Sequence, residues 1–341
     1  MTPKIIYVDN FLTGHGHTPT TGVTLVKLFR EEGYTVIPTS KKQHKVLRLA
    51  DMLFTIAFNS RNAVALIATY STSAFQFAWM CSLICRLFHI PYIPCLHGGN
   101  LPQRIKDSPK KAAEVFANSY MNVAVSGYLQ KSMTDNGWKS LVIPNNINID
   151  AYPFKHRTSC SPSILWVRSF HKIYNPALAI RILRTLLQNY PDATLTMVGP
   201  DKDESFEQCK TLANELGVEN RVTFTGLLPR TEWVILAERN DIFINTTNFD
   251  NLPVSVVEAM ALGFATISTN VGGVPYLIED EKNGLLVAPD DEPAFVNAII
   301  RVLNDRKLSE RLSFAARRKA EEFDWRNVKT SWNSLFSSVS K

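Results

Sequence analysis

Short apolar runs alternate with longer amphipathic stretches along nearly all of the 341-residue chain. The runs are too short for helices and are rich in β-branched residues, as strands buried in a parallel sheet are. In the first half they predict strands at Ile5–Val8, Thr35–Pro38, Val64–Thr69, Tyr92–Leu96, Asn122–Val125 and Ser140–Ile143. The stretches between them predict helices, among them Thr21–Glu32, which Gly33 ends, and Pro109–Asn118. This alternation predicts a parallel sheet wrapped by helices.

A second series of the same kind follows a polar segment, residues 144–163, which contains three prolines and is typical of a linker. Its strands are predicted at Ile164–Val167, Thr194–Val198, Arg221–Thr225, Asp241–Asn245, Ala265–Ser268 and Gly284–Val287. Two such series predict an α/β protein with two doubly wound, Rossmann-like domains, residues 1–158 and 159–324, and ligand crevices at the carboxyl ends of the strands. A last helix is predicted from Trp325 onward.

Composition narrows the class of protein. Hydrophobic residues make up 45% and charged residues 20% of the chain, which excludes a disordered or fibrous protein. The most apolar stretch, residues 74–90, is interrupted by Gln76, Ser82, Arg86 and His89 and falls short of the roughly 18 apolar residues of a membrane span. A buried helix is the favoured interpretation, and a helix in a membrane interface is the alternative. The N-terminus lacks a secretory-signal pattern, so we expect a cytoplasmic protein.

The most informative segment is residues 250–263, DNLPVSVVEAMALG, a polar loop followed by a helix. Asp250 or Asn251 is expected to cap this helix, and Pro253 suits its first turn. Asp250 then lies ahead of the helix and Glu258 within it, so two carboxylates bracket a helix N-terminus. The helix N-terminus favours a phosphate group, whereas carboxylates suit the hydroxyls of a ribose and a sugar. A sugar nucleotide requires both kinds of contact.

This segment resembles the Glu-x7-Glu motif of the family 4 retaining glycosyltransferases, with Asp250 at the first acidic position. Other segments that are similar to the family are Thr269–Pro275, Leu277–Val287, Val142–Asn148, Thr196–Pro200 and Val222–Gly226. The resemblance implies the GT-B fold, in which two Rossmann-like domains face a central cleft. It also implies that the C-terminal helix, residues 325–341, packs back onto the first domain.

The resemblance also implies roles for individual residues. Glu258 is expected to bind the donor ribose and Asp250 the donor sugar; the alternatives are a helix-surface carboxylate for Glu258 and a helix cap for Asp250. Further donor-binding positions implied by the resemblance are Gly199, Gly226, Leu227, Asn251, Leu252, Pro253, Val254 and Ser255.

Catalysis by such an enzyme requires positive charge at the departing diphosphate. The family places an Arg after the first strand of the second domain and a Lys-Gly pair shortly after it. Arg168 fits the first position; Lys172 is the candidate for the second, although the Lys-Gly pair is absent and a solvated loop lysine is the alternative. No metal or other cofactor is expected. A DxD sequence, residues 201–203, could suggest a metal site, but it lies in a charged loop that we expect to be solvated.

In the first domain, His97 follows the strand Tyr92–Leu96, at a position where the family often has a His facing the donor sugar. A hydrogen-bonded structural histidine is the alternative. Acceptor-side positions implied by the resemblance are Gly14, His15, Gly16, Gly98, Gly99 and Ser126. The alternatives are a flexible loop for the first three and a helix cap for Ser126.

The resemblance implies a metal-independent, retaining glycosyltransferase that moves a hexosyl group from a nucleoside-diphosphate sugar to a hydroxyl acceptor. Synthesis of a cell-surface polysaccharide or a glycolipid is the expected setting. A sugar-nucleotide epimerase, or a sugar-nucleotide-binding protein without activity, is the alternative. Binding to nucleic acid is not expected, because the basic residues follow no known nucleic-acid module.

The formal net charge of +6 is unevenly distributed, at +9 in residues 1–160 and −3 in residues 161–341. Basic residues gather in two groups, Lys41, Lys42, Lys45 and Arg48, and Arg104, Lys106, Lys110 and Lys111. Such clusters favour an anionic membrane or a lipid-phosphate acceptor, which predicts a peripheral protein on the cytoplasmic face of a membrane. A solvated basic face is the alternative.

Overall fold

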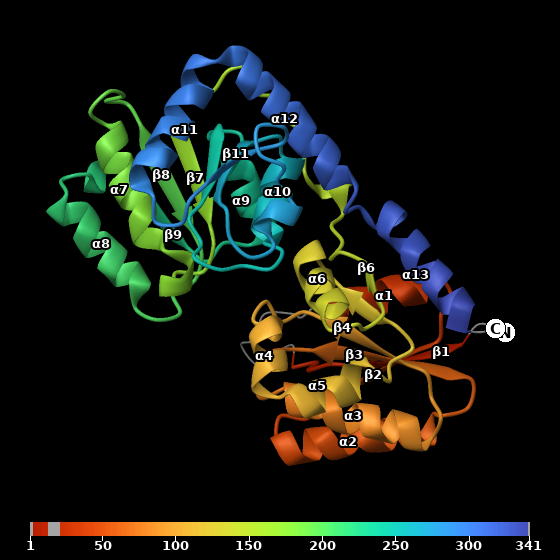
Figure 1. Ribbon diagram of the computed structural model, residues 1–341. Helices are drawn as coiled ribbons and strands as arrows, with labels where there is room; N and C mark the ends of the chain where they lie inside the picture. The colour runs from red at the N-terminus through yellow and green to blue at the C-terminus, as the bar shows by residue number, and fades with distance from the viewer. Residues whose placement is uncertain (1–2, 13–20, 340–341) are drawn as a thin grey trace. The chain divides into compact units, whose positions relative to one another are not determined.

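The computed structural model describes residues 3–12 and 21–339, which form two compact units, each built on one parallel sheet (Figure 1). The first unit contains residues 1–145 and 326–341, and the second contains residues 146–325. With these bounds, the first unit has 18 Lys and Arg against 7 Asp and Glu, a net charge of +11.

The first sheet has six strands in the order β2-β1-β3-β4-β5-β6, and every neighbouring pair is parallel. Its strands are β1 (Lys4–Val8), β2 (Val36–Thr39), β3 (Ala63–Thr69), β4 (Tyr92–Leu96), β5 (Asn122–Ala124) and β6 (Ser140–Val142). Its helices are α1 (Thr21–Glu31), α2 (Lys45–Phe58), α3 (Phe75–Leu87), α4 (Leu101–Asp107), α5 (Pro109–Phe116) and α6 (Gly127–Asp135). All residues of β3 and β4 are buried, which explains their uninterrupted apolar runs.

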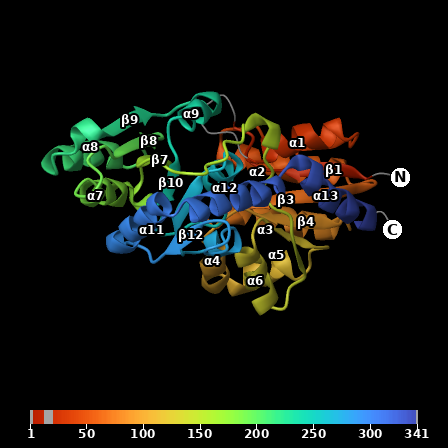
Figure 2. The same cartoon turned by 90° about the horizontal axis from the view of Figure 1, so that it is seen from above.

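The last helix, α13 (Trp325–Val339), lies beside α1 in both views (Figure 2). The ring centroids of Phe29 and Trp332 are 5.4 Å apart, and those of Phe29 and Phe336 are 5.3 Å apart. The Tyr34 hydroxyl donates to Asn333 Oδ1 at 2.8 Å. Aromatic packing therefore fixes α13 to the first unit.

The second sheet has the strand order β12-β11-β10-β7-β8-β9 and is also parallel throughout. Its strands are β7 (Ser163–Val167), β8 (Thr194–Val198), β9 (Val222–Gly226), β10 (Ile242–Asn245), β11 (Ala265–Thr269) and β12 (Leu285–Val287). Its helices are α7 (Pro176–Leu186), α8 (Ser205–Glu215), α9 (Arg230–Leu236), α10 (Val254–Ala261), α11 (Glu292–Asn304) and α12 (Arg306–Glu321). Four 3-10 turns, η1 (Ile149–Ala151), η2 (Lys172–Tyr174), η3 (Glu219–Arg221) and η4 (Val274–Tyr276), complete the described part of this unit.

The segment predicted as a linker is instead part of the second unit. Ile147, Ile149 and Tyr152 are buried in its core. The Arg157 side chain is also buried: its guanidinium lies 3.9 Å from the Phe264 ring centroid and donates to the carbonyl oxygens of residues 155, 237, 240 and 262. The boundary therefore falls between residues 145 and 146, not at residue 158, because this polar stretch carries the side chains that hold it to the second unit.

The predicted fold class is otherwise confirmed, and each predicted strand end lies within one residue of the observed one. Among the described helices, none combines the length and the apolar character that crossing a bilayer requires. All five cysteines have free thiols.

Candidate active site

Arg168 and Asp250 form an ion pair at the carboxyl edge of the second sheet. Arg168 directly follows β7, and its backbone N–H donates to Val198 O at 3.0 Å. Its guanidinium lies 4.3 Å from the ring centroid of Tyr174. The exposed fractions of the Arg168 and Asp250 side chains are 19% and 11%. Arg168 Nε is buried and has no hydrogen-bond partner in the described part of the chain.

The loop after β10 brings Asp250 to Arg168. The Thr246 hydroxyl accepts from the Trp166 indole at 3.0 Å and lies 2.9 Å from the carbonyl oxygens of Tyr174 and Asn175. The backbone N–H of Asn248 donates to Ile173 O at 2.8 Å. The loops after β7 and β10 are therefore joined before any ligand binds.

Two glycines of the segment 269–275 pack against the backbone that carries Asp250. Gly273 N donates to Asp250 O at 3.0 Å. A Cβ at Gly272 would lie 2.0 Å from Asp250 O, and one at Gly273 would lie 1.7 Å from Asn251 O. A Cβ at Gly199 would lie 1.8 Å from Arg168 O. These glycines are therefore needed for close backbone approach around the ion pair.

Replacement of Gly273 by Ala is expected to lower the free energy of unfolding by about 3 kcal/mol, because the clash is with backbone that cannot turn away. Gly217→Ala is the control: Gly217 also lies in the second unit and has φ +66°, but a Cβ there has no atom within 4 Å. That variant is expected to lose only about 1–2 kcal/mol, from left-handed backbone strain. If urea unfolding gave equal losses of unfolding free energy for the two variants, the close approach of Gly273 to the backbone of Asn251 would be contradicted.

Glu258 lies inside α10 and is buried, with two partners that hold its carboxylate. The Tyr152 hydroxyl donates to Glu258 Oε1 at 2.5 Å. Arg230 Nε lies 3.0 Å from the same oxygen, and the Arg230 side chain is 61% exposed. Arg230 is the first residue of α9, and it therefore joins the loop after β9 to the carboxylate.

Burial dominates the electrostatics of both carboxyl groups. It raises the pKa of Asp250 above its ordinary value, although Arg168 acts in the opposite direction. Burial likewise raises the pKa of Glu258, against the lowering effects of Tyr152, Arg230 and Arg168. Because Arg168 acts on both carboxyl groups, the three side chains form one electrostatic cluster.

The N-terminus of α10 lies beside this cluster. The cap residue is Pro253, not Asp250 or Asn251 as predicted, and Asp250 Oδ1 instead accepts from Asn251 N at 2.8 Å. The prediction was wrong because Asp250 pairs with Arg168 and a proline can itself stand at the cap. Ser255 Oγ is buried and has no partner among the residues that the structure describes. Val256 N and Val257 N donate to Pro253 O, so this hydroxyl and the N–H groups of Val254 and Ser255, which precede them, are the groups that can donate to an anion.

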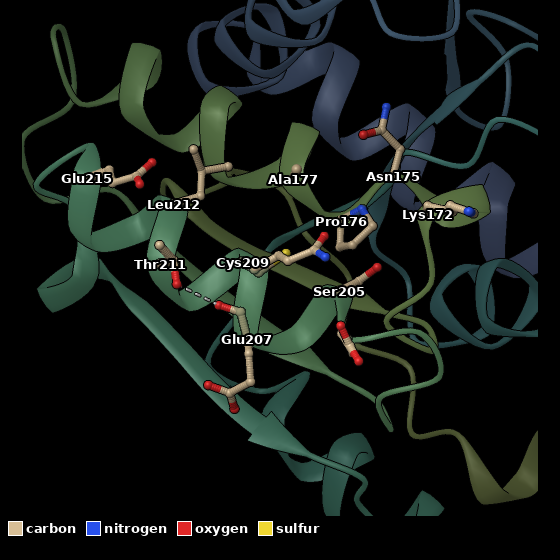
Figure 3. A pocket seen from close by; sticks show the side chains of 12 residues that line it. Lys172, Asn175, Pro176, Ala177, Ser205, Glu207, Cys209, Thr211, Leu212 and Glu215 are labelled. Atoms are coloured by element: carbon tan, nitrogen blue, oxygen red, sulfur yellow. Dashed lines mark hydrogen bonds between the residues drawn. The ribbon is translucent and has the colours of Figure 1, made fainter.

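Lys172, the second predicted cation, is exposed in η2 and lines a pocket of about 570 Å³ between α7 and α8 (Figure 3). In the described residues its ammonium group has no ion-pair partner. Its backbone N–H donates to Asp203 Oδ2 at 2.9 Å. The structure therefore does not bring Lys172 into the Arg168–Asp250 pair.

The two carboxylates of the DxD sequence bind the backbone around α8. Asp203 accepts from Lys172 N and Ser205 N, and Asp201 Oδ1 accepts from Phe206 N at 3.4 Å. Residues 3–12 and 21–339 contain no group of three or more His, Cys, Asp or Glu side chains placed to hold a metal ion.

In the first unit, His97 follows β4, and its ring centroid lies 5.7 Å from that of Tyr70. His97 Nε2 is buried and has no partner within the described ranges, and burial lowers the pKa of the imidazole. A Cβ at Gly98 would lie 2.4 Å from Ser71 N, so this glycine allows close approach to the chain itself. Ser126 Oγ accepts from Leu129 N at 3.3 Å and caps α6. Gly14, His15 and Gly16 lie outside the described residues.

Of the other predicted donor-binding residues, Gly226 ends β9 and Leu227 follows it with an exposed side chain, whereas Leu252 and Val254 flank the Pro253 cap. Sequence reasoning missed Tyr152, Arg230 and Tyr174. Tyr152 was hidden in the apparent linker. The signal for Arg230 is its place shortly after Val222–Gly226, one of the segments that is similar to the family 4 glycosyltransferases.

Comparisons with known proteins agree with this geometry. The sequence model described as glycosyl transferases group 1 matches residues 148–319, just over half of the chain. A putative glycosyltransferase of Bacillus subtilis, YtcC, is 26% identical over 253 residues, which are 66% of this chain and 62% of that protein. A glycogen synthase of Mycobacterium tuberculosis is 28% identical over 200 residues, 57% of this chain and 47% of that protein. This chain spans about half the length of the curated relatives it matches.

Solved structures extend the similarity to both units. HepE of Anabaena in complex with UDP and glucose has a TM-score of 0.77 at 17% identity, covering 98% of this chain and 100% of HepE. Sucrose-phosphate synthase of Thermosynechococcus elongatus has a TM-score of 0.79 at 14% identity, covering 99% of both chains. These likenesses show the GT-B fold class. With the match over residues 148–319, they lead to the conclusion that the chain belongs to the glycosyl transferases group 1 family.

Proposed function

We propose that the protein is a retaining glycosyltransferase that moves a sugar from a nucleoside-diphosphate sugar to a hydroxyl acceptor. The observation that carries the proposal is the cluster of Arg168, Asp250 and Glu258 beside the N-terminus of α10. It offers a cation and N–H donors for a diphosphate, and two carboxylates for sugar and ribose hydroxyls. Buried Arg168 Nε and Ser255 Oγ, both without a partner in the described chain, are the donors that a diphosphate would engage.

In the proposed reaction, the bond from the sugar C1 to the diphosphate oxygen breaks as the acceptor oxygen bonds to C1 on the same face. The departing phosphate oxygen takes the proton of the acceptor hydroxyl. Arg168 and the first N–H groups of α10 stabilise the negative charge on the leaving group, so the proposed reaction needs no metal. Asp250 orients the sugar, and Glu258 holds the ribose through its hydroxyls.

A uridine-diphosphate sugar is the first donor to test, because HepE was crystallised with UDP and with UDP-glucose. The relatives are named for different products: one is a glycogen synthase and others are D-inositol 3-phosphate glycosyltransferases and a sulfoquinovosyl transferase. We therefore propose only the acceptor class, a hydroxyl of a polysaccharide or glycolipid on the cytoplasmic face of a membrane. His97, Gly98, Gly99 and Ser126 are proposed to serve the sugar and acceptor.

A thermal-shift screen of nucleoside diphosphates and their sugars tests this function. A ligand at 100 times its Kd is expected to raise Tm by about 5–10 °C, because binding to the folded state adds about 2.7 kcal/mol. With the labelled donor that binds, a transferase releases the nucleoside diphosphate and transfers or slowly hydrolyses the sugar. An epimerase would convert the sugar without releasing it. A shift without turnover would favour a binding protein, and no shift with any nucleotide would overturn the proposal.

A further inference from the structure

The outer face of α2 carries large apolar side chains that are mostly exposed. Val46, Leu47, Phe54 and Phe58 have exposed fractions of 68%, 60%, 62% and 83%. At about 100° per residue they fall within about 120° of one another around the helix, so they form one stripe. The rings of Phe54 and Phe58 are stacked, with centroids 6.1 Å apart. We call these four residues the α2 face.

The opposite side of α2 already has a partner. Met52 and Ile56 are buried in a core that includes Ala78, Cys81 and Cys85 of α3. Figure 1 shows α2 and α3 side by side along one face of the first sheet. A helix of a soluble protein usually shows one apolar stripe toward its core and polar residues outward. Helix α2 is apolar on both sides, so packing within the described part of the first unit does not account for the α2 face.

Apolar exposure continues at the end of α3. Leu87 is 68% exposed and Phe88, which follows the helix, is 44% exposed. Because α2 and α3 both run back along parallel strands, they end at the same edge of the sheet. Helix α3 lies within residues 74–90, the stretch for which a helix in a membrane interface is the alternative interpretation. This stretch therefore lies beside the α2 face.

Positive charge borders this apolar surface. Lys41, Lys42 and Lys45 are exposed at the start of α2. Helix α3 contains no acidic residue, and the single carboxylate of α2, Asp51, accepts from Thr39 Oγ1. Arg48 is not part of the charged border, because it is buried and donates to the carbonyl oxygens of Lys42 and Gln43.

We propose that the α2 face, with Lys41, Lys42 and Lys45, binds the interface of an anionic lipid bilayer. A helix that binds a membrane interface combines two elements: apolar side chains that enter the boundary of the acyl chains, and lysines that contact lipid phosphates. A second copy of the chain fits poorly, since pairing the same faces would bring these lysines together on a unit of net charge +11. The inference deepens the proposed function and rests on it only for the membrane setting of the acceptor.

Flotation of the full chain with vesicles tests the proposal. The vesicles are phosphatidylcholine alone or phosphatidylcholine with about 30% phosphatidylglycerol, at low and high salt. Wild type is expected to float with the anionic vesicles and to be released in part by salt. Phe54→Ser/Phe58→Ser is expected to weaken binding about tenfold or more, and Phe314→Ser, which removes an exposed phenylalanine from the second unit, is expected to leave it unchanged.

A charge series completes the test. Lys41→Glu/Lys42→Glu/Lys45→Glu is expected to remove the preference for anionic vesicles, whereas the same reversal at Lys210, Lys282 and Lys307 of the second unit is not. Absence of flotation at low salt, or unchanged flotation of Phe54→Ser/Phe58→Ser, would overturn the proposal. So would a change in that variant from dimer to monomer with vesicle binding intact, which would assign the face to a second copy. Thermal shifts with nucleotides in the same preparations test the donor site separately.

Discussion

Glu258→Gln is expected to lower kcat/KM for the donor by about 10²-fold or more, with most of the loss in donor affinity. A carboxylate that accepts from ribose hydroxyls makes charge-assisted hydrogen bonds worth about 1.5–3 kcal/mol each, and the amide keeps only one neutral acceptor. The loss of donor affinity is measured from Tm as a function of nucleotide concentration, with the donor that the thermal-shift screen identifies. A variant with near-normal turnover and donor affinity would remove Glu258 from the proposed site.

The fold is expected to survive this substitution. Because burial raises the folded-state pKa of Glu258 above its unfolded value, ionisation of the group costs stability at pH values above both. A neutral amide avoids that cost and still offers an oxygen to Tyr152. The free energy of unfolding of Glu258→Gln is therefore expected to equal or exceed that of wild type at neutral pH, while activity falls.

Tyr152→Phe separates the structural role of the carboxylate from its proposed role in binding. It removes the hydroxyl that donates to Glu258 Oε1 but leaves the carboxylate and Arg230 in place. We expect a loss of about 1 kcal/mol in stability and less than a tenfold change in kcat/KM. Tyr92→Phe, which removes a 2.9 Å hydrogen bond to Val115 O in the first unit, is the matched control for stability.

The central strands could be predicted closely from sequence because they lie in parallel sheets and are buried on both faces. A run such as Ala63–Thr69, with every residue buried, is apolar throughout and stands out from its polar borders. Paired glycines at positions 272 and 273 were recognised as a motif, but the atoms they approach, Asp250 O and Asn251 O, depend on a contact across two loops. A glycine motif is visible in the sequence, but the backbone atoms that make glycine necessary are visible only in the structure.

The errors arose where polar residues are buried by long-range contacts. Arg157 is ordinarily a surface residue type, yet it is buried here because carbonyl oxygens from residues 237, 240 and 262 surround its guanidinium. Tyr152 and Glu258 are partners although 106 residues separate them. Local composition therefore assigned residues 144–163 to a linker, and it could not identify Tyr152 as a partner of the site.

Arg168→Met is expected to lower kcat by about 10²–10³-fold, because it removes the cation proposed to stabilise charge on the departing diphosphate. Donor affinity is expected to change less, since that charge develops as the bond breaks. Lys172→Met is expected to have a smaller effect, because its side chain lines the pocket between α7 and α8 (Figure 3). Arg181→Met is the control: its guanidinium pairs with Asp290 and Glu292 at the surface, and its loss is expected to leave kcat unchanged.

A loss of activity in Arg168→Met must be distinguished from a loss of folding. Removing Arg168 leaves Asp250 buried without its cation, which is expected to cost about 3 kcal/mol of stability. In Arg168→Met/Asp250→Asn the unpaired charge is gone, so we expect stability to return while the rate of transfer stays as low as in Arg168→Met. Recovery of transfer together with stability would show that the pair holds the loops in place and takes no part in the reaction. A larger loss of kcat in Lys172→Met than in Arg168→Met would assign the diphosphate contact to the other cation.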